Sequence, residues 1–227
     1  MIVAIHQPNY LPWRGYFFKI AQSDAFVLLD DVQYSKNSYT NRVKIMREGA
    51  ARWLTQPVSF RFGDPINIVT FARDDWKKAH LDSLEGAYRR APEFTSVWPE
   101  IAALYGGLNE ENISAANAKI IMGICEHLNI SCRFHLSSEI EVHDARSEDR
   151  LIEIVDQIAP GGCYLSGRGG AQYQDPGKFS AAGLELKYAN FQHSTYEQGT
   201  SSFIAGLSVF DAVFHLGWQR TAQLLRT

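Results

Sequence analysis

The sequence of 227 residues predicts an α/β fold with a mostly parallel β-sheet flanked by helices, together with helical additions. Two observations support this fold class. The first ~35 residues suggest a strand, a polar loop, a helix and a second strand, which is the order of a right-handed βαβ unit. Strands and helices alternate again over residues 114–191. No linker or repeat divides the chain, so we expect a single α/β domain over residues 1–227, with a helical subregion at about 74–128.

The N-terminal elements follow from the positions of the apolar residues. A β-branched run at residues 2–5 predicts a buried strand, and residues 25–29 predict a second one. Pro12 fits the first turn of a helix that continues to about Gln22. Because a helix separates the two strands, we expect them to be parallel neighbours.

The later elements are predicted by apolar periodicity and by capping residues. Residues 35–68 are less regular, with one strand predicted at about 52–58. Ser114 and Ser147 are candidate N-caps of two helices. The sequence predicts helices at about 74–90, 114–127, 147–158 and 207–225, and strands at about 132–136, 163–165 and 183–191.

Composition narrows the class of protein. The net charge is -3, from 22 Lys+Arg and 25 Asp+Glu, and 45% of the residues are hydrophobic. These values exclude a disordered chain and argue against nucleic-acid binding by bulk charge. No apolar run approaches the ~20 residues that span a bilayer, and the N-terminus does not resemble a signal peptide. We therefore expect no membrane span.

Cysteine and histidine spacing predicts neither a disulfide framework nor a metal site. Cys125, Cys132 and Cys163 are odd in number and lack the close spacing of zinc ligands. The seven histidines show no tight metal-binding spacing. Reduced thiols in a cytoplasmic protein are therefore expected, no structural zinc is predicted, and the identity of any cofactor stays open.

Three polar segments follow predicted strands and form the main site hypothesis. They are residues 6–10, 30–33 and 166–170. Ligands of open α/β sheets bind beyond the carboxyl ends of the strands. If the strands are parallel neighbours, all three segments meet at one edge of the sheet.

The first segment combines an imidazole, two amides and a phenol with a helix start. His6 could bond a phosphate or act as a general acid or base, or it could hold the loop by bonding backbone. Gln7 and Asn9 are candidate donors, although Asn9 is also a common turn residue. Tyr10 and Trp13 could stack on a base or sugar, and core packing is the alternative for Trp13.

The second segment carries two adjacent carboxylates. Asp30 or Asp31 could bind a hydroxyl or an amine, or hold a divalent ion with Gln33. A solvated strand end or a cap is the other interpretation. Adjacent strand residues point to opposite faces, so one of the two is expected to face a given site, and Asp30 is favoured.

The third segment is rich in glycine. The backbone at Ser166, Gly167 and Gly169 could approach a phosphate closely, with Arg168 paired to it. The segment matches neither the P-loop nor the dinucleotide-binding pattern, and a plain tight turn is the alternative.

Two helices carry further candidates. His80 lies on an apolar stripe, where a packed histidine is the competing interpretation, and Lys77 could steer an anion or lie on a solvated face. Asp211 and His215 could form an acid–imidazole pair, although Ser208 and Asp211 also have the spacing of a capping box.

The N-terminal block resembles the signature of a known family. Residues 5–19 read IHQPNYLPWRGYFFK and residues 23–38 read SDAFVLLDDVQYSKNS, and both resemble the WbqC-like proteins. The resemblance runs nearly end to end. It extends to Arg42, WKKAH at 76–80, YLSG at 164–167 and LSVFD at 207–211, whereas His215 departs from an asparagine expected there.

The resemblance implies a bacterial protein associated with O-antigen or other surface-polysaccharide biosynthesis. Members have been described as glycyl or acyl transferases to amino sugars. Asn37, Arg42, Lys77 and His80 lie in segments that match, and they are candidate substrate-binding residues. The order of strand, His-bearing loop, helix and acidic strand is also similar to the nucleotidylyltransferase type of Rossmann-like fold, although no HxGH motif follows.

The leading hypothesis is an enzyme that transfers a small acyl or aminoacyl group, such as glycyl, to the amine of a nucleotide-linked sugar. His6 and Asp30 are the candidate catalytic residues, because the attacking amine must lose a proton. One alternative is an enzyme that uses ATP and Mg²⁺ to activate a carboxylate or phosphate. The other is a non-catalytic accessory protein. The expected partner is a nucleotide-linked sugar or another phosphorylated small molecule, and a homodimer is left open.

Overall fold

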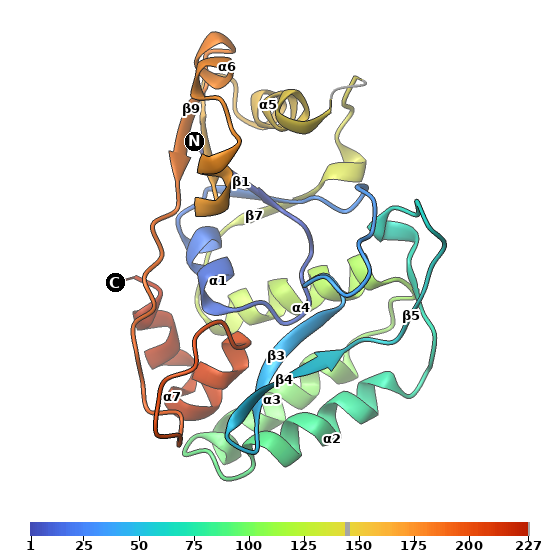
Figure 1. Cartoon of the computed structure of the whole chain (residues 1–227), viewed down its shortest axis with the longest axis vertical. Coiled ribbons are helices and arrows are strands. Elements are labelled where there is room, and N and C mark those ends of the chain that lie inside the picture. The colour runs from blue at the N-terminus through green and yellow to red at the C-terminus, as the bar shows by residue number, and fades with distance from the viewer. Residues whose placement is uncertain (144–145, 227) are drawn as a thin grey trace.

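The computed structural model describes residues 1–143 and 146–226, and its central feature is a five-stranded parallel sheet (Figure 1). The strand order is β7-β2-β1-β8-β9, and every neighbouring pair is parallel. The predicted α/β class with a Rossmann-like sheet is thereby confirmed. The strands are β1 (Ile2–His6), β2 (Ala25–Leu28), β7 (Arg133–Leu136), β8 (Cys163–Ser166) and β9 (Glu185–Tyr188).

The direction in which the chain crosses the sheet reverses beside β1. The chain runs outward from β1 to β2 and β7, and then returns to the other side of β1 to form β8 and β9. The reversal therefore lies between β1 and β8, where open α/β sheets leave a crevice at the carboxyl ends of their strands. The crossover helices are α1 (Arg14–Ala21), α5 (Ser147–Ile158) and α6 (Pro176–Ala181).

Alternate residues of the central strands face two separate hydrophobic layers. Ala4 and Phe26 pack with α1 and with α4 (Ile113–His127). Val3 and Val27 pack on the opposite face against α5 and α6 (Figure 1). This two-residue alternation explains why both strands are almost fully buried, as their β-branched and aromatic sequence predicts.

A long insertion between β2 and β7 holds the parts that sequence reasoning described least well. It contains β3 (Arg42–Arg47), β4 (Ala50–Thr55), β5 (Val58–Ser59), β6 (Thr70–Phe71), α2 (Trp76–Tyr88), α3 (Phe94–Gly106) and α4. The strand expected at 52–58 is wrong in extent, because β4 begins at Ala50 and pairs with β3. Glu48 and Gly49 both have positive φ, so they form the two-residue turn that joins these strands.

The helix boundaries also differ from the sequence-based expectations at two caps. Asn112, rather than Ser114, caps α4, because its side chain accepts a hydrogen bond from the Ala115 N–H at 2.9 Å. Ser147 is the first helical residue of α5 rather than its cap. The C-terminal helix α7 (Val209–Leu224) is kinked at Gly217, whose φ is 74°. No helix among the described residues is long and apolar enough to cross a membrane.

A buried hydrogen-bond chain joins the loop after β1 to the insertion. The Nε2–H of His80 donates to the Thr55 carbonyl at 3.0 Å, so Nδ1 accepts from the Tyr10 hydroxyl at 2.6 Å. Tyr10 in turn accepts from the hydroxyl of Tyr105. The donor and acceptor of each of these three hydrogen bonds are therefore fixed only while His80 is neutral.

Acidification is expected to destabilise the protein through His80. Burial lowers its pKa from 6.5 to about 4, so between these values the unfolded state binds more protons than the folded state. The free energy of unfolding should therefore fall by about 3 kcal/mol as the pH drops through this window. Urea unfolding at several pH values measures the effect. His80→Gln should make the profile less steep without flattening it, because the pKa of the buried His6 is lowered as well, to about 3. An unchanged profile in His80→Gln would contradict the assignment.

Candidate functional site

A cavity of about 250 Å³ opens where the sheet reverses direction, between the carboxyl ends of β1 and β8. The end of β1, the helix α1, the glycine-rich segment after β8 and the chain after β9 form its walls. The structure thus brings together the first and third of the polar segments that the sequence singles out. The lining residues are His6, Trp13, Gly15, Tyr16, Lys19, Gly167, Arg168, Gly169, Ala189 and Phe191.

His6 presents a neutral imidazole to this cavity. Its Nδ1–H donates to the Gln7 carbonyl at 3.2 Å, which leaves a lone pair on Nε2. Burial and the nearby Lys19 lower the pKa of His6 to about 3. The imidazole therefore acts at neutral pH as a hydrogen-bond acceptor, and it is a weak base.

Five lining residues were not among the sequence candidates: Gly15, Tyr16, Lys19, Ala189 and Phe191. Of these, Lys19 carries an amine into the cavity wall. Its side chain is buried, with the residue only 4% exposed, and Nζ donates to the Ile5 carbonyl at 2.9 Å. Burial lowers the pKa of Lys19 to about 7. A signal was present in the sequence, because Lys19 falls one helical turn after Tyr16, on the apolar inward face of α1.

Aromatic rings form one wall of the cavity. The indole of Trp13 packs against Phe191 edge to face, with centroids 5.2 Å apart, and stacks on His193 at 5.2 Å. A Cβ at Gly15 would overlap this indole, so the glycine makes room for Trp13. The wall offers a flat apolar surface beside the polar groups of His6 and Lys19.

The glycine-rich segment after β8 forms a single 3-10 turn, η3 (Arg168–Gln172). Its backbone at Gly167 and Gly169 faces the cavity, and the exposed Arg168 donates to the side chain of Asn190. Ser166 is buried at the end of β8 and does not line the cavity. The segment therefore offers a guanidinium and closely approachable backbone on one side of the cavity.

The second polar segment, residues 30–33, does not line this cavity, and its Asp30 is hydrogen-bonded to the turn that follows the outer strand β7. The carboxylate of Asp30 accepts hydrogen bonds from Ser137 and Ser138, including 3.0 Å from the Ser138 N–H, and so anchors the turn η2 (Ser137–Glu139). Asp31 forms an ion pair with Arg150, and Gln33 is exposed.

The other candidate residues lie outside the cavity lining, in three kinds of environment. Four of them make hydrogen bonds within the protein. Gln7 accepts from the Thr40 hydroxyl, and Lys77 donates to the Leu108 carbonyl. Tyr10 and His80 are hydrogen-bonded to each other. Asn9 is buried and Asn37 is exposed. Arg42 stacks over the ring of Trp53.

Residues 189–206, which make up most of the chain between β9 and α7, carry Phe191 and are called the strap below (Figure 1). Its first part is held by α1, because the guanidinium of Arg14 donates to the Ser194 carbonyl at 2.6 Å and lies over the ring of Tyr196. The strap therefore links a wall of the cavity to the C-terminal helix.

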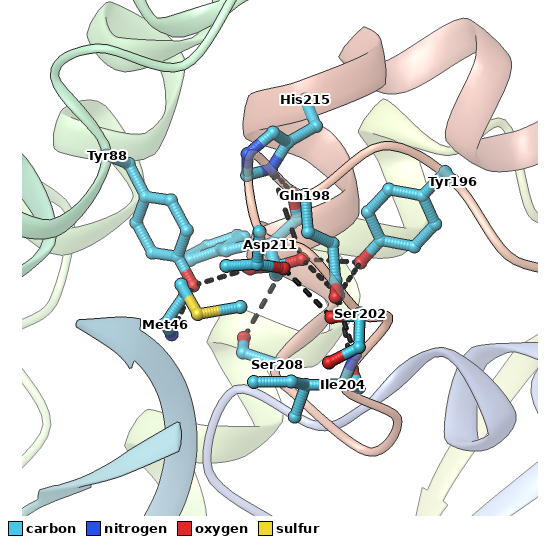
Figure 2. A network of polar contacts seen from close by, with 11 residues as sticks. Met46, Tyr88, Tyr196, Gln198, Ser202, Ile204, Ser208, Asp211 and His215 are labelled. Atoms are coloured by element: carbon cyan, nitrogen blue, oxygen red, sulfur yellow. Dashed lines mark hydrogen bonds and ion pairs between the residues drawn. The ribbon is translucent and has the colours of Figure 1, made fainter. Parts of the chain in front are cut away.

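Asp211 anchors the second part of the strap (Figure 2). Its fully buried carboxylate accepts from the Tyr196 hydroxyl at 2.6 Å, from Gln198 Nε2 at 2.9 Å and from the Tyr88 hydroxyl at 3.1 Å. Burial raises the pKa of Asp211, and these three donors oppose that rise.

The Asp211 carboxylate therefore does not complete a capping box. Ser208 alone caps α7, accepting from the Phe210 N–H at 3.3 Å. The pairing with His215 is loose, since its Nδ1 bonds the Asp211 backbone carbonyl at 2.8 Å and lies 3.9 Å from the carboxylate.

Comparison with known proteins places the chain in a family. The family model described as the WbqC-like protein family matches residues 7–223. The chain is also similar to the uncharacterized protein Rv1507c of Mycobacterium tuberculosis (strain ATCC 25618 / H37Rv). The two are 34% identical over 218 residues, which cover 95% of this chain and 94% of that protein.

Proposed function

Because this chain belongs to the WbqC-like protein family, we propose that its β1/β8 cavity transfers a small acyl or aminoacyl group, such as glycyl, to the amine of a nucleotide-linked sugar. The reaction would serve surface-polysaccharide biosynthesis. The free thiols of Cys125, Cys132 and Cys163 support a cytoplasmic location. One observation carries the proposal: the buried amine of Lys19 and the neutral imidazole of His6 line the same cavity.

The proposed reaction needs a base. The acceptor amine attacks the carbonyl carbon of an activated acyl donor, the new N–C bond forms, and the donor's leaving group departs with the electron pair. The attacking nitrogen must also release one proton. General bases work best when their pKa lies near the working pH, and the pKa of Lys19 is about 7. We therefore assign the proton to the neutral amine of Lys19.

The remaining groups of the cavity are suited to bind the substrate and to orient its amine. The lone pair on His6 Nε2 accepts an N–H of the attacking amine and aims its nitrogen at the carbonyl carbon. Arg168 and the backbone N–H groups beside it suit a phosphate or the oxygen that gains charge during attack. Trp13 and Phe191 offer apolar contact to the sugar ring.

The size of the cavity limits what it holds. About 250 Å³ is below the volume of typical drug-sized ligand sites. The cavity accommodates the reacting sugar and acyl group, while the nucleotide part lies outside it.

A ligand screen followed by a transfer assay tests the proposal. A thermal-shift panel would contain nucleotide-linked amino sugars, their unaminated counterparts, acyl thioesters, and ATP with Mg²⁺. A ligand at ~100 times its Kd adds about 2.7 kcal/mol of stability, which moves the Tm by several degrees. A response to ATP with Mg²⁺ alone would favour the activating enzyme, and binding without turnover would favour an accessory protein.

His6 and Asp30 can be separated in the same assay. His6→Ala is expected to lower kcat by about 10-fold, the value of one hydrogen bond to a reacting group. Asp30→Asn should change kcat by less than about 3-fold, because the Asp30 carboxylate bonds Ser137 and Ser138. A loss of about 100-fold in folded Asp30→Asn would instead make Asp30 the base.

A further inference from the structure

The outer face of the β3–β4 hairpin carries an unusual group of side chains. Val43 and Leu54 point inward and are buried in the core. Arg42, Lys44 and Trp53 lie on the opposite face, where Lys44 and Trp53 are direct cross-strand partners. This face lies outside the β1/β8 cavity and has no role in the chemistry proposed above.

Two large aromatic rings are exposed on this face. Trp53 is 43% exposed and Tyr39 is 47% exposed, and their ring centroids are 5.7 Å apart. An exposed Trp–Tyr pair is costly to hydrate and presents flat surface to solvent. Flat aromatic surface of this kind stacks on nucleobases, because every base has a π-face.

Two cations, Arg42 and Lys44, border the same rings. The guanidinium carbon of Arg42 lies 4.1 Å from the centroid of the Trp53 ring, and Lys44 Nζ lies 5.2 Å from it. No residue in the described part of the chain forms an ion pair with Arg42 or Lys44. Arg42 Nε is also buried without a hydrogen-bond partner. The face therefore holds two uncompensated positive charges, which suit an anion such as a phosphate.

The chain that bears His6 continues directly toward this face. The Tyr10 N–H donates to the Tyr39 carbonyl at 2.9 Å, and the Thr40 hydroxyl donates to Gln7 Oε1 at 3.1 Å. The loop after β1 thus has His6 in the cavity, while Gln7 and Tyr10 are hydrogen-bonded to Thr40 and Tyr39, shortly before the hairpin begins at Arg42.

We infer that the aromatic–cationic face formed by Tyr39, Arg42, Lys44 and Trp53 binds the nucleoside diphosphate part of the substrate. The base stacks on Trp53 beside Tyr39, and the phosphates pair with Arg42 and Lys44. As a subsite for a sugar nucleotide this inference rests on the proposed function. The same chemistry would also bind a free nucleoside diphosphate.

Isothermal titration calorimetry with nucleoside diphosphates tests the inference. The probes are the diphosphates of uridine, thymidine, guanosine and cytidine, with inorganic pyrophosphate and free nucleosides as partial ligands. Trp53→Ala is expected to weaken binding of the preferred diphosphate by about 10–100-fold. Trp53→Phe, which keeps a stacking ring, should recover most of the affinity, and its Tm reports whether the hairpin remains folded.

Charge variants examine the phosphate contacts. Arg42→Gln and Lys44→Gln should each weaken diphosphate binding by about 10-fold and leave nucleoside binding unchanged. Arg52→Gln is the matched control, because Arg52 is exposed on the same hairpin but pairs with Ile45, on the face away from Trp53. Equal losses in Arg52→Gln and Arg42→Gln, or parent affinity in Trp53→Ala, would overturn the inference. Absence of diphosphate binding to the parent would also overturn it.

The two proposals can fail separately. Lys19→Met protein should bind the free diphosphate with the parent's affinity, because Lys19 lies in the cavity and not on the hairpin. A nucleotide-linked sugar should bind more tightly than the free diphosphate if the cavity holds the sugar. If transfer activity is absent while Trp53→Ala still loses diphosphate binding, the hairpin site stands and the proposed reaction falls.

Discussion

Replacement of Lys19 by methionine is expected to lower kcat of the proposed transfer by about 10²–10⁴-fold, the usual contribution of a general base. Methionine has a similar length and no titratable group. The cavity wall should therefore keep its shape while the proton acceptor is lost. The measurement is the rate of amide formation under saturating donor and acceptor. Lys78→Met, on an exposed face of α2, is the matched control and should retain the parent's kcat.

The stability of Lys19→Met separates a chemical role from a structural one. The folded state holds the pKa of Lys19 at about 7, below its ordinary 10.5, so at pH 7 the buried amine costs folding free energy. Its removal is expected to leave the Tm unchanged or higher. A lower Tm with a proportionate loss of activity would contradict the assignment, as would parent activity in the folded variant.

The pH profile provides an independent measure of the same group. The rate of the proposed transfer by the parent protein should rise with pH through about 7, as Lys19 loses its proton. His6 does not produce this rise, because its pKa of about 3 keeps it neutral throughout the range.

Replacement of Asp211 by alanine is expected to lower the free energy of unfolding by about 4 kcal/mol. The loss leaves the buried donors of Tyr88, Tyr196 and Gln198 without their acceptor (Figure 2). Urea unfolding measures the effect, and the Tm should fall by about 10 °C. Asp82→Ala is the control, since Asp82 pairs with Lys78 on the surface and should cost less than about 1 kcal/mol. A loss below about 1 kcal/mol in Asp211→Ala would show that the network is not the anchor of the strap.

The sequence was sufficient to predict the sheet and one part of the site. The strands at 2–5 and 25–29 were evident because both faces of a central parallel strand are buried and the sequence is continuously apolar. The polarity change after each strand then marked His6 and the glycine-rich segment as neighbours on one edge of the sheet. This inference required only the parallel order of the strands.

Other features depend on contacts between distant segments. Asp30 follows the end of β2 much as His6 ends β1, but its carboxylate accepts hydrogen bonds from Ser137 and Ser138, in the turn η2 that follows β7 much later in the sequence. The position of Lys19 on the apolar face of α1 can be recognised in the sequence, but a lysine in a helix is ordinarily solvated, so its burial follows only from the packing of α1 on the sheet. Residues 189–206 have no periodicity, and their packing on Trp13 and Asp211 follows from tertiary structure alone.

The residues proposed for the reaction and a residue proposed to contact the sugar lie in different parts of the sequence. His6 and Lys19 belong to the first βαβ unit, whose backbone is fixed by the sheet, whereas Phe191 belongs to an irregular segment pinned by Arg14 and Asp211. Strap residues that take no part in these two contacts are free to differ in length and sequence without disturbing the sheet, whereas Tyr196 and Gln198 are held by Asp211. If the proposed transfer is the reaction, a related protein could change its acceptor by exchanging strap residues around Phe191 while keeping Tyr196 and Gln198.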